Sequence, residues 1–226
     1  MKRFFDVICS VIGLVILSPI LIWIAWYIKH EDYGPVFYRG ERVGRHGKPF
    51  RIFKFRTMAV DAEERGASST SDDDQRITKI GRFLRKYKLD ELPQLINVLK
   101  GDMSIVGPRP EVKKFTDLFS DEEKAILTVR PGITDWASIW NPDEGAFLKG
   151  SVDPDRDYLE KIRPEKIRLQ LKYVRESSLI TDLKIIGLTL LVLLRPQSPA
   201  IKELSARVAG QRSANSRQKQ ESGGGS

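Results

Sequence analysis

Two adjacent carboxylates, Asp90 and Glu91, stand where the sequence predicts the start of a helix. Apolar residues follow them at helical spacing, at Leu92, Leu95, Ile96 and Leu99. Free N–H groups at a helix N-terminus suit phosphates, and a carboxylate that attacks phosphorus gives an acyl phosphate. The simpler interpretation is structural. An aspartate at the helix N-cap stabilises the helix by roughly 1 kcal/mol, and a glutamate in the first turn interacts favourably with the positive end of the helix dipole. The pair alone leaves both interpretations open.

Basic residues elsewhere in the chain are candidates for binding the phosphate that such a nucleophile would attack. They are Lys54, Arg56, Arg85 and Arg109. Lys54 and Arg56 share one face of a predicted strand, whereas Arg109 lies between two prolines in a Gly/Pro-rich loop. A site for a nucleotide-sugar diphosphate needs such cations, and often Mg²⁺ held by oxygen ligands. Each residue also has an ordinary explanation, as part of a solvated strand face or a rigid surface loop.

Composition argues against several other kinds of site. The chain has 226 residues and a formal net charge of +8, which suits nucleic acid, an anionic membrane face or phosphorylated substrates. Cys9 is the single cysteine, so neither an intrachain disulfide nor a cysteine metal cluster can form. Only His30 and His46 are available for a zinc site or a Ser-His-Asp triad. Any catalysis would therefore rest on carboxylates and cations.

A nearly continuous apolar segment at residues 7–28 predicts a membrane anchor, because about 20 such residues can span a bilayer. Pro19 in its middle predicts a kink, at which the Ser18 hydroxyl can satisfy a freed carbonyl. Positive charge lies on both sides of the segment, at Lys2, Arg3 and Lys29. This gives no inside–outside bias, so a kinked single pass and a re-entrant helix both remain open.

The remaining pattern predicts a mainly helical α/β domain with one small sheet. Short strands are expected at 36–38 and 50–55. Helices are expected from Leu92 to Gly101, after Glu111, after a capping box at 120–123, over 154–175, and over 179–194. The last of these is apolar but too short to span, so we expect it to lie on the core or in the membrane interface.

Three parts follow from this pattern: an anchor at 1–30, a folded domain at 31–200 and a polar tail at 201–226. The tail is expected to be disordered, and its final GGGS has the composition of an artificial linker. Residues 59–75, with three consecutive aspartates, are expected to form a solvated loop.

The stretch KLDELPQLINVLKGDMSIVGPRPE at 88–111 resembles the signature of the bacterial sugar transferase family, the monotopic phosphoglycosyl transferases. Other motifs resemble the same family: KRFFD near the N-terminus with its later Ser-Pro, FKFRTM at 53–58, RPGIT at 130–134, and Asp182-Leu183-Lys184. The resemblance covers about residues 1–195. More than twenty matched positions in one stretch make it far more specific than a short pattern.

The resemblance implies a re-entrant membrane helix broken at Ser18-Pro19, with the catalytic domain on the cytoplasmic face of the bacterial inner membrane. It implies that Asp90 attacks the β-phosphate of a UDP-sugar and binds Mg²⁺, that UMP is released, and that Glu91 assists. The phospho-sugar would pass to undecaprenyl phosphate, as the first membrane step of O-antigen, capsule, exopolysaccharide or glycoprotein synthesis. Positions that match the family's basic residues would bind phosphates, at Lys54, Arg56, Arg85, Arg109 and Arg130.

The chain differs from the family pattern at one place and leaves some features open. Many members read PGITGWAQ, where this chain has Asp135 and Ser138, a change expected to alter the sugar or nucleotide pocket. The chain is short, as expected for a minimal catalytic form. The sugar, the polyprenol preference and the oligomeric state, including a homodimer, are open.

Three other functions stay possible on the residues alone. One is a membrane-bound protein that holds anionic lipid or nucleic acid, although the sequence shows no aromatic–basic platform for stacking bases, and no nucleic-acid partner is expected. Another is a glycosyltransferase that moves the sugar without its phosphate and releases UDP. The last is a phosphoglycosyl transferase in which the adjacent pair Asp90 and Glu91, called the dyad below, acts only as a base that activates the acceptor.

Overall fold

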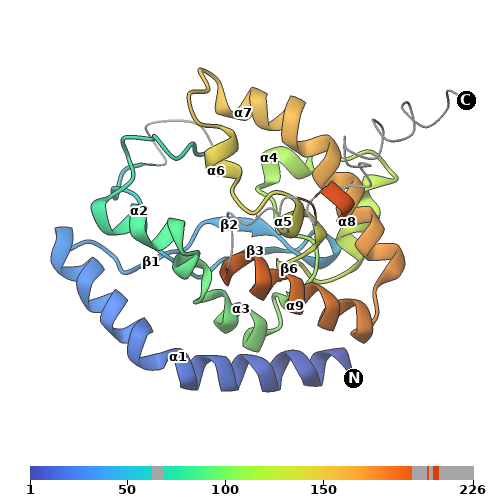
Figure 1. Cartoon of the computed structure of the whole chain (residues 1–226), viewed down its shortest axis with the longest axis horizontal. Coiled ribbons are helices and arrows are strands. Elements are labelled where there is room, and N and C mark those ends of the chain that lie inside the picture. The colour runs from blue at the N-terminus through green and yellow to red at the C-terminus, as the bar shows by residue number, and fades with distance from the viewer. Residues whose placement is uncertain (63–68, 195–202, 204–205, 209–226) are drawn as a thin grey trace, which may run out of the picture.

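A 31-residue helix, α1 (Lys2–Asp32), begins the chain and changes direction along its length (Figure 1). The computed structural model describes residues 1–62, 69–194, 203 and 206–208. Pro19 lies inside α1, and since it has no N–H it leaves the carbonyl of Val15 without its helical partner. The Ser18 hydroxyl donates to that carbonyl at 2.8 Å. The predicted role of Ser18 at a proline bend is therefore confirmed.

Both halves of α1 pack against the body of the protein. In the first half, the buried carboxylate of Asp6 accepts hydrogen bonds from Ser104 Oγ at 2.9 Å and from the Ile105 N–H at 3.2 Å. In the second half, Ile24 and Ile28 are buried in a cluster with Phe55, Ile80 and Leu84. The outward face is apolar and exposed, at Phe4, Val11, Ile12, Val15, Ile16, Ile22, Trp23 and Trp26. Among the described helices, α1 alone is long and apolar enough to cross a membrane.

The predicted strands at 36–38 and 50–55 are present, and together with an unpredicted strand at 41–43 they form two small antiparallel pairs. β1 (Phe37–Tyr38) pairs with β4 (Lys54–Phe55), and β2 (Glu41–Val43) pairs with β3 (Pro49–Arg51). A 3-10 turn at Arg45–Gly47 joins β2 to β3. The sequence did not predict a third pair, in which β5 (Ser104–Val106) runs parallel to β6 (Gly132–Thr134).

Backbone contact explains two glycines beside β5 and β6. A Cβ at Gly132 would lie 2.1 Å from the amide nitrogen of Gly107, and a Cβ at Gly107 would lie 2.4 Å from the carbonyl oxygen of Arg130. Only glycine allows two chains to approach this closely. The pair therefore brings the loop after β5 directly against the start of β6.

The helix predicted after the carboxylate pair is present and has the predicted end. α2 (Lys79–Lys86) leads into a 3-10 turn at Leu89–Glu91 and then into α3 (Gln94–Lys100). Pro93 immediately precedes α3, and Gly101 ends it in the left-handed conformation with φ 90°. Asp90 and Glu91 therefore occupy a tight turn before the helix rather than its first turn.

The second half of the chain is helical. It contains α4 (Lys113–Thr116), a 3-10 helix at Glu123–Thr128, α5 (Trp136–Trp140), α6 (Glu144–Phe147), α7 (Pro154–Asp157), a π turn at Tyr158–Ile162, α8 (Arg163–Glu176) and α9 (Leu179–Leu194). The capping box is confirmed, because the Ser120 N–H donates to Glu123 Oε2 and the Glu123 N–H donates to Ser120 Oγ. The π turn interrupts the single helix expected over 154–175.

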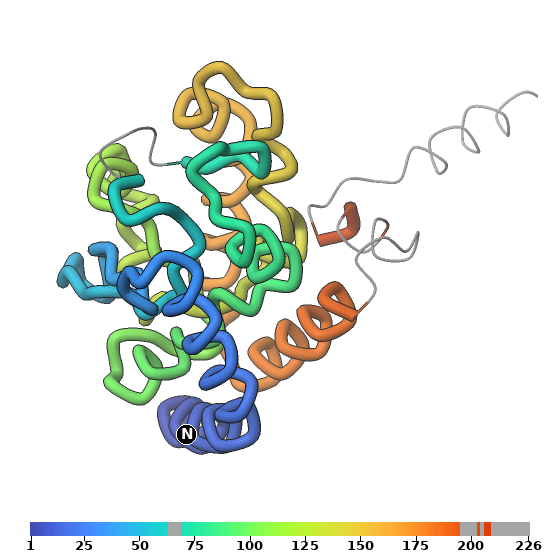
Figure 2. Tube along the Cα trace, turned by 90° about the vertical axis from the view of Figure 1, so that its left-hand side faces the viewer, coloured from blue at the N-terminus to red at the C-terminus, as the bar shows by residue number. Residues whose placement is uncertain are grey.

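The main core lies where α5, α8 and α9 meet the parallel pair. Its buried members include Val106, Trp136, Ile139, Leu169, Tyr173 and Ile185. α9 (orange) and the N-terminal half of α1 (blue) run along the same lower side of the molecule in Figures 1 and 2. The fold is mainly helical, as the sequence predicted, but the described residues form three two-stranded sheets instead of the one small sheet that was expected. Most of the tail at 201–226 lies outside the described residues.

Candidate active site

Asp90 is buried in the turn between α2 and α3, with 1% of its surface exposed. Lys88 adopts a left-handed conformation with φ 55°, which reverses the chain after α2 and starts this turn. One carboxylate oxygen of Asp90, Oδ2, lies 2.8 Å from Lys54 Nζ, so β4 supplies its countercharge. The other oxygen, Oδ1, is buried without a hydrogen-bond partner among the described residues. An unpaired buried carboxylate oxygen is costly, and its presence is typical of a functional site.

Glu91 is bound by Arg109 through both oxygens. Arg109 Nη1 donates to Oε2 at 2.8 Å and Nη2 donates to Oε1 at 2.6 Å, while Lys54 Nζ lies 3.4 Å from Oε1. Burial alone would raise the pKa of Glu91, but the charges of Arg109 and Lys54 outweigh it and hold that pKa well below its usual range. Glu91 in turn raises the pKa of Arg109. The two carboxylates of the dyad therefore differ in their partners: both oxygens of Glu91 are bound, whereas one oxygen of Asp90 is not bound by any described residue.

The position of Arg109 follows from the parallel strand pair. Arg109 lies just after β5, in the loop Gly107–Pro108–Arg109–Pro110, where proline on both sides restricts the backbone. Its Nη1 also donates to the carbonyl of Ile133 in β6 at 3.2 Å. The guanidinium of Arg109 thus binds both the dyad, through Glu91, and strand β6.

Arg85 lies beside the dyad without a salt bridge to it. Its Nε donates to Thr57 Oγ1 at 3.0 Å, and its two terminal nitrogens make no hydrogen bond to any described residue. Burial lowers the pKa of Arg85, and the nearby charges of Asp90 and Asp72 only partly offset that effect. A buried guanidinium with N–H groups still available is suited to binding a phosphate.

Two of the predicted phosphate-binding residues have other partners. Arg56 is buried and binds Asp32 at the end of α1, together with the carbonyls of Pro35 at 2.6 Å and Met58 at 3.1 Å. Arg130 donates from Nε to the carbonyl of Gly101 at 3.0 Å. The structure therefore gathers Lys54, Arg85 and Arg109 around the dyad, while the contacts of Arg56 and Arg130 lie elsewhere.

The sequence analysis missed several residues around the dyad. Asp143 pairs with Lys88 at 3.7 Å, and the Asp72 N–H donates to the carbonyl of Gly145 at 3.1 Å. Segments near residues 72 and 145 therefore meet beside the dyad. Gln170, from α8, is completely buried and was also missed. No local pattern marks such residues, because the fold alone brings them to the site.

The donor set fits Mg²⁺ in one way. No group of three or more His, Cys, Asp or Glu side chains among the described residues converges on a metal position. Mg²⁺, however, commonly binds one or two carboxylates and completes its shell with water and substrate phosphates. Asp90 offers one unpaired carboxylate oxygen for that arrangement. Asp90 is thus the residue in this site that would hold Mg²⁺.

The sequence was compared with known protein families and with curated proteins. The profile of the family described as bacterial sugar transferase matches residues 1–196. A UDP-N-acetylgalactosamine-undecaprenyl-phosphate N-acetylgalactosaminephosphotransferase of Aeromonas hydrophila is 45% identical over 141 residues, which are 61% of this chain and 33% of the relative.

Two further relatives match most of this chain. An undecaprenyl-phosphate galactose phosphotransferase of Salmonella typhimurium is 38% identical over 210 residues, covering 86% of this chain and 40% of the relative. A UDP-glucose:undecaprenyl-phosphate glucose-1-phosphate transferase of Escherichia coli is 39% identical over 192 residues, covering 84% of this chain and 39% of the relative. The chain therefore spans well under half the length of these relatives.

Proposed function

The chain belongs to the bacterial sugar transferase family, and we propose that it transfers a sugar phosphate from a UDP-sugar to undecaprenyl phosphate and releases UMP. The names of the relatives support this reaction, since each specifies undecaprenyl phosphate and a sugar phosphate. Three relatives name three different sugars, so they do not select the sugar of this chain. The product would be the first lipid-linked intermediate of a bacterial glycoconjugate such as O-antigen, capsule, exopolysaccharide or glycoprotein.

The unequal pairing of the dyad is the observation that carries the proposal. Glu91 is tied to Arg109 through both oxygens, whereas Asp90 keeps one oxygen unpaired. In the first step, an oxygen of Asp90 bonds to the β-phosphorus of the UDP-sugar. The bond between that phosphorus and the bridging oxygen breaks, and UMP leaves with the bridging oxygen. The result is a sugar phosphate linked to Asp90 as an acyl phosphate.

The second step returns the enzyme to its starting state. A phosphate oxygen of the acceptor bonds to the same phosphorus, and the bond from phosphorus to the Asp90 oxygen breaks. The sugar is then joined to the lipid through a diphosphate, and the Asp90 carboxylate is regenerated. Two displacements at one phosphorus make the reaction ping-pong. Glu91 would keep Arg109 in place during both steps.

Cations around the dyad would reduce the repulsion between a carboxylate nucleophile and a diphosphate. Lys54 lies 2.8 Å from Asp90, and Arg85 has N–H groups available for a phosphate. Bound Mg²⁺ would neutralise charge on the diphosphate and on the leaving UMP. Asp90 is the residue that would hold it. Because Asp90 is buried, substrate binding would also require a local movement around the dyad.

We further propose that α1 is re-entrant and that the domain lies on the cytoplasmic face of the inner membrane. Both ends of α1 bind the same body, because Lys2 bonds to the Val106 carbonyl at 3.0 Å and Asp32 pairs with Arg56. A straight single pass would place these ends on opposite sides of the bilayer. Helix α9 also carries exposed apolar side chains, which support its contact with the cytoplasmic leaflet that α1 would enter and leave. They are Ile180, Leu183, Leu190, Leu191 and Leu194.

One assay tests the reaction. The purified 226-residue chain is incubated with a panel of UDP-sugars, undecaprenyl phosphate and Mg²⁺, and UMP and UDP are measured for the wild type and for D90N. We expect UMP with one or a few sugars, no UMP with D90N, and no UMP when EDTA is added. A ³²P label at the β-phosphate should remain on the wild-type protein when the acceptor is omitted. Release of UDP, or full activity of D90N, would refute the proposed mechanism.

A further inference from the structure

Asp135, which directly follows β6 and precedes α5, is completely buried. Its Oδ1 caps α5, accepting from the Ser138 N–H at 2.7 Å and from Ser138 Oγ at 2.8 Å. Its Oδ2 has a different set of partners, the Arg109 N–H at 3.3 Å and Gln170 Nε2 at 3.4 Å. Asp135 therefore joins the start of α5 to the loop that carries Arg109.

Gln170 makes a second side-chain contact with the Arg109 backbone. It is completely buried on α8, and its Nε2 donates to the Arg109 carbonyl at 3.4 Å as well as to Asp135. Both partners are acceptors, so the amide nitrogen must face them. The N–H of Arg109 is thus bound by Asp135 and its C=O by Gln170. Side chains therefore bind the backbone of Arg109, the residue that binds Glu91, on both of its peptide groups.

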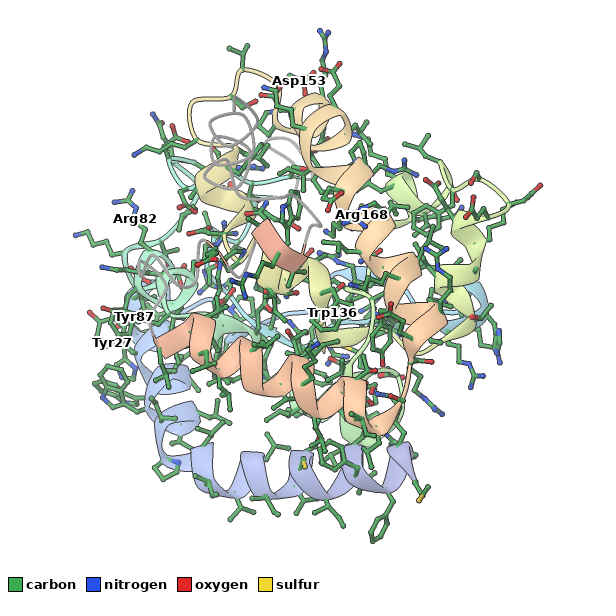
Figure 3. The ribbon with its side chains drawn as sticks, turned by 45° about the vertical axis from the view of Figure 1, so that its right-hand side comes forward. Tyr27, Arg82, Tyr87, Trp136, Asp153 and Arg168 are labelled. Carbon is green, nitrogen blue, oxygen red and sulfur yellow. The ribbon has the colours of Figure 1, made fainter. Side chains whose placement is uncertain are left out.

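The same face of α8 binds this segment at two other points. Tyr173 Oη lies 3.1 Å from the Val106 carbonyl oxygen, and Lys166 Nζ lies 2.8 Å from Glu111 Oε1. Residues 166, 170 and 173 lie on one side of a helix, and they contact positions 111, 109 and 106 in turn. The ring centroid of Trp136, a residue labelled in Figure 3, lies 5.3 Å from Lys172 Nζ of α8 and 5.5 Å from Lys184 Nζ of α9.

A cap alone does not account for a buried aspartate here. Serine, threonine or asparagine would cap α5 about as well without burying a charge. Among the described contacts, Asp135 has hydrogen-bond donors but no ion pair to offset that charge. The second oxygen of the carboxylate, which serine lacks, is the one that reaches Arg109 and Gln170.

We propose that Asp135 and Gln170 are positioning residues that hold the Arg109 backbone so that its guanidinium meets both oxygens of Glu91. This inference rests on the proposed phosphoglycosyl transfer. In the described structure both residues contact the Arg109 backbone rather than Asp90 or Glu91. Displacement of Arg109 by about 1 Å would break the two short bonds to Glu91 and slow the chemical step.

The test compares D135S with D135A and Q170L, measured as UMP release by the purified chain. D135S keeps an oxygen that can cap α5 but lacks the one that binds Arg109. We expect D135S and Q170L each to lower kcat at least about tenfold, with KM for the UDP-sugar changed less. The control is T189V, which removes the 2.7 Å contact between Thr189 and Thr134, beside Asp135, and should keep kcat. Thermal unfolding corrects each rate for the folded fraction.

The R109A background separates positioning from a general effect on the fold. There D135S should cause less than about a twofold further loss, because the group that it positions is already absent. The inference is overturned if D135S is as active as the wild type. It is also overturned if D135S lowers the slow residual rate of R109A by the same factor as it lowers the wild-type rate. If the wild type releases no UMP with any UDP-sugar, the proposed function itself fails, which is a different outcome.

Discussion

Asp90 and Glu91 are neighbours in the chain, yet one keeps a buried oxygen unpaired while the other is bound through both oxygens. The difference arises from their partners. Lys54 offers a single ammonium to Asp90, whereas Arg109 presents a planar fork that matches the two oxygens of Glu91. A pair of like charges is thereby divided into a candidate nucleophile and a fixed structural anion.

Replacement of Arg109 by lysine should lower the rate of UMP release on the order of 100-fold. Lysine keeps the positive charge but cannot bind both oxygens of Glu91, so the orientation of the dyad is lost. Steady-state assays of R109K and E91Q, with thermal unfolding to verify folding, measure this effect. The matched control is R130K, because Arg130 binds the carbonyl of Gly101 rather than the dyad. R109K with wild-type kcat would show that the fork is not needed.

Replacement of Arg56 should affect stability more than chemistry. Arg56 is buried and joins β4 to the end of α1 through Asp32 and the carbonyl of Pro35. R56A should lower the free energy of unfolding by about 2 kcal/mol, as expected when a charged group loses its hydrogen bonds. Denaturant unfolding in detergent gives this value, and UMP release per folded molecule gives the activity. Unchanged stability with abolished activity would instead make Arg56 a substrate-binding residue.

Sequence reasoning identified Asp90, Glu91 and Arg109 as candidate site residues because they lie in two short motifs. KLDELP places Asp90 and Glu91 before a helix, and GPRP places Arg109 in a rigid loop. It also predicted the Ser18 contact, since the effect of proline on the preceding turn is local. These features depend on residues only a few positions apart.

The sequence could not assign the remaining partners, because they come from distant parts of the chain. Lys54 and Arg56 share a predicted strand face, but one meets the dyad and the other meets Asp32. Only the packing of α1 against β4 separates their roles. The parallel pair of β5 and β6 was missed for a similar reason, since each strand has three residues and its partner lies some 28 positions away in the chain.

The N-terminus of α1 should be coupled energetically to α9 through Lys2 and Asp182. Asp182 is buried and is bound by Lys2 Nζ and by Tyr173 Oη at 2.8 Å. Removal of Lys2 leaves a buried carboxylate with less compensation, so K2A and D182A should each destabilise the protein by about 2 kcal/mol. The double variant should cost at least about 1 kcal/mol less than the sum of the two. Additive losses in a double-mutant cycle would mean that the two residues act independently.

The stability contributed by Glu91 should be lost in acid. Its pKa in the folded state is held below the ordinary value of 4.5, so the folded protein releases this proton more readily than the unfolded chain. The contribution is therefore fully present above about pH 5 and falls as the pH drops below 4.5 toward the lowered value. The difference in unfolding free energy between the wild type and E91Q isolates it, because other groups titrate in both proteins. We expect about 2 kcal/mol at pH 7 and a clearly smaller difference at pH 3. An equal difference at both pH values would show that Arg109 does not depress the pKa of Glu91.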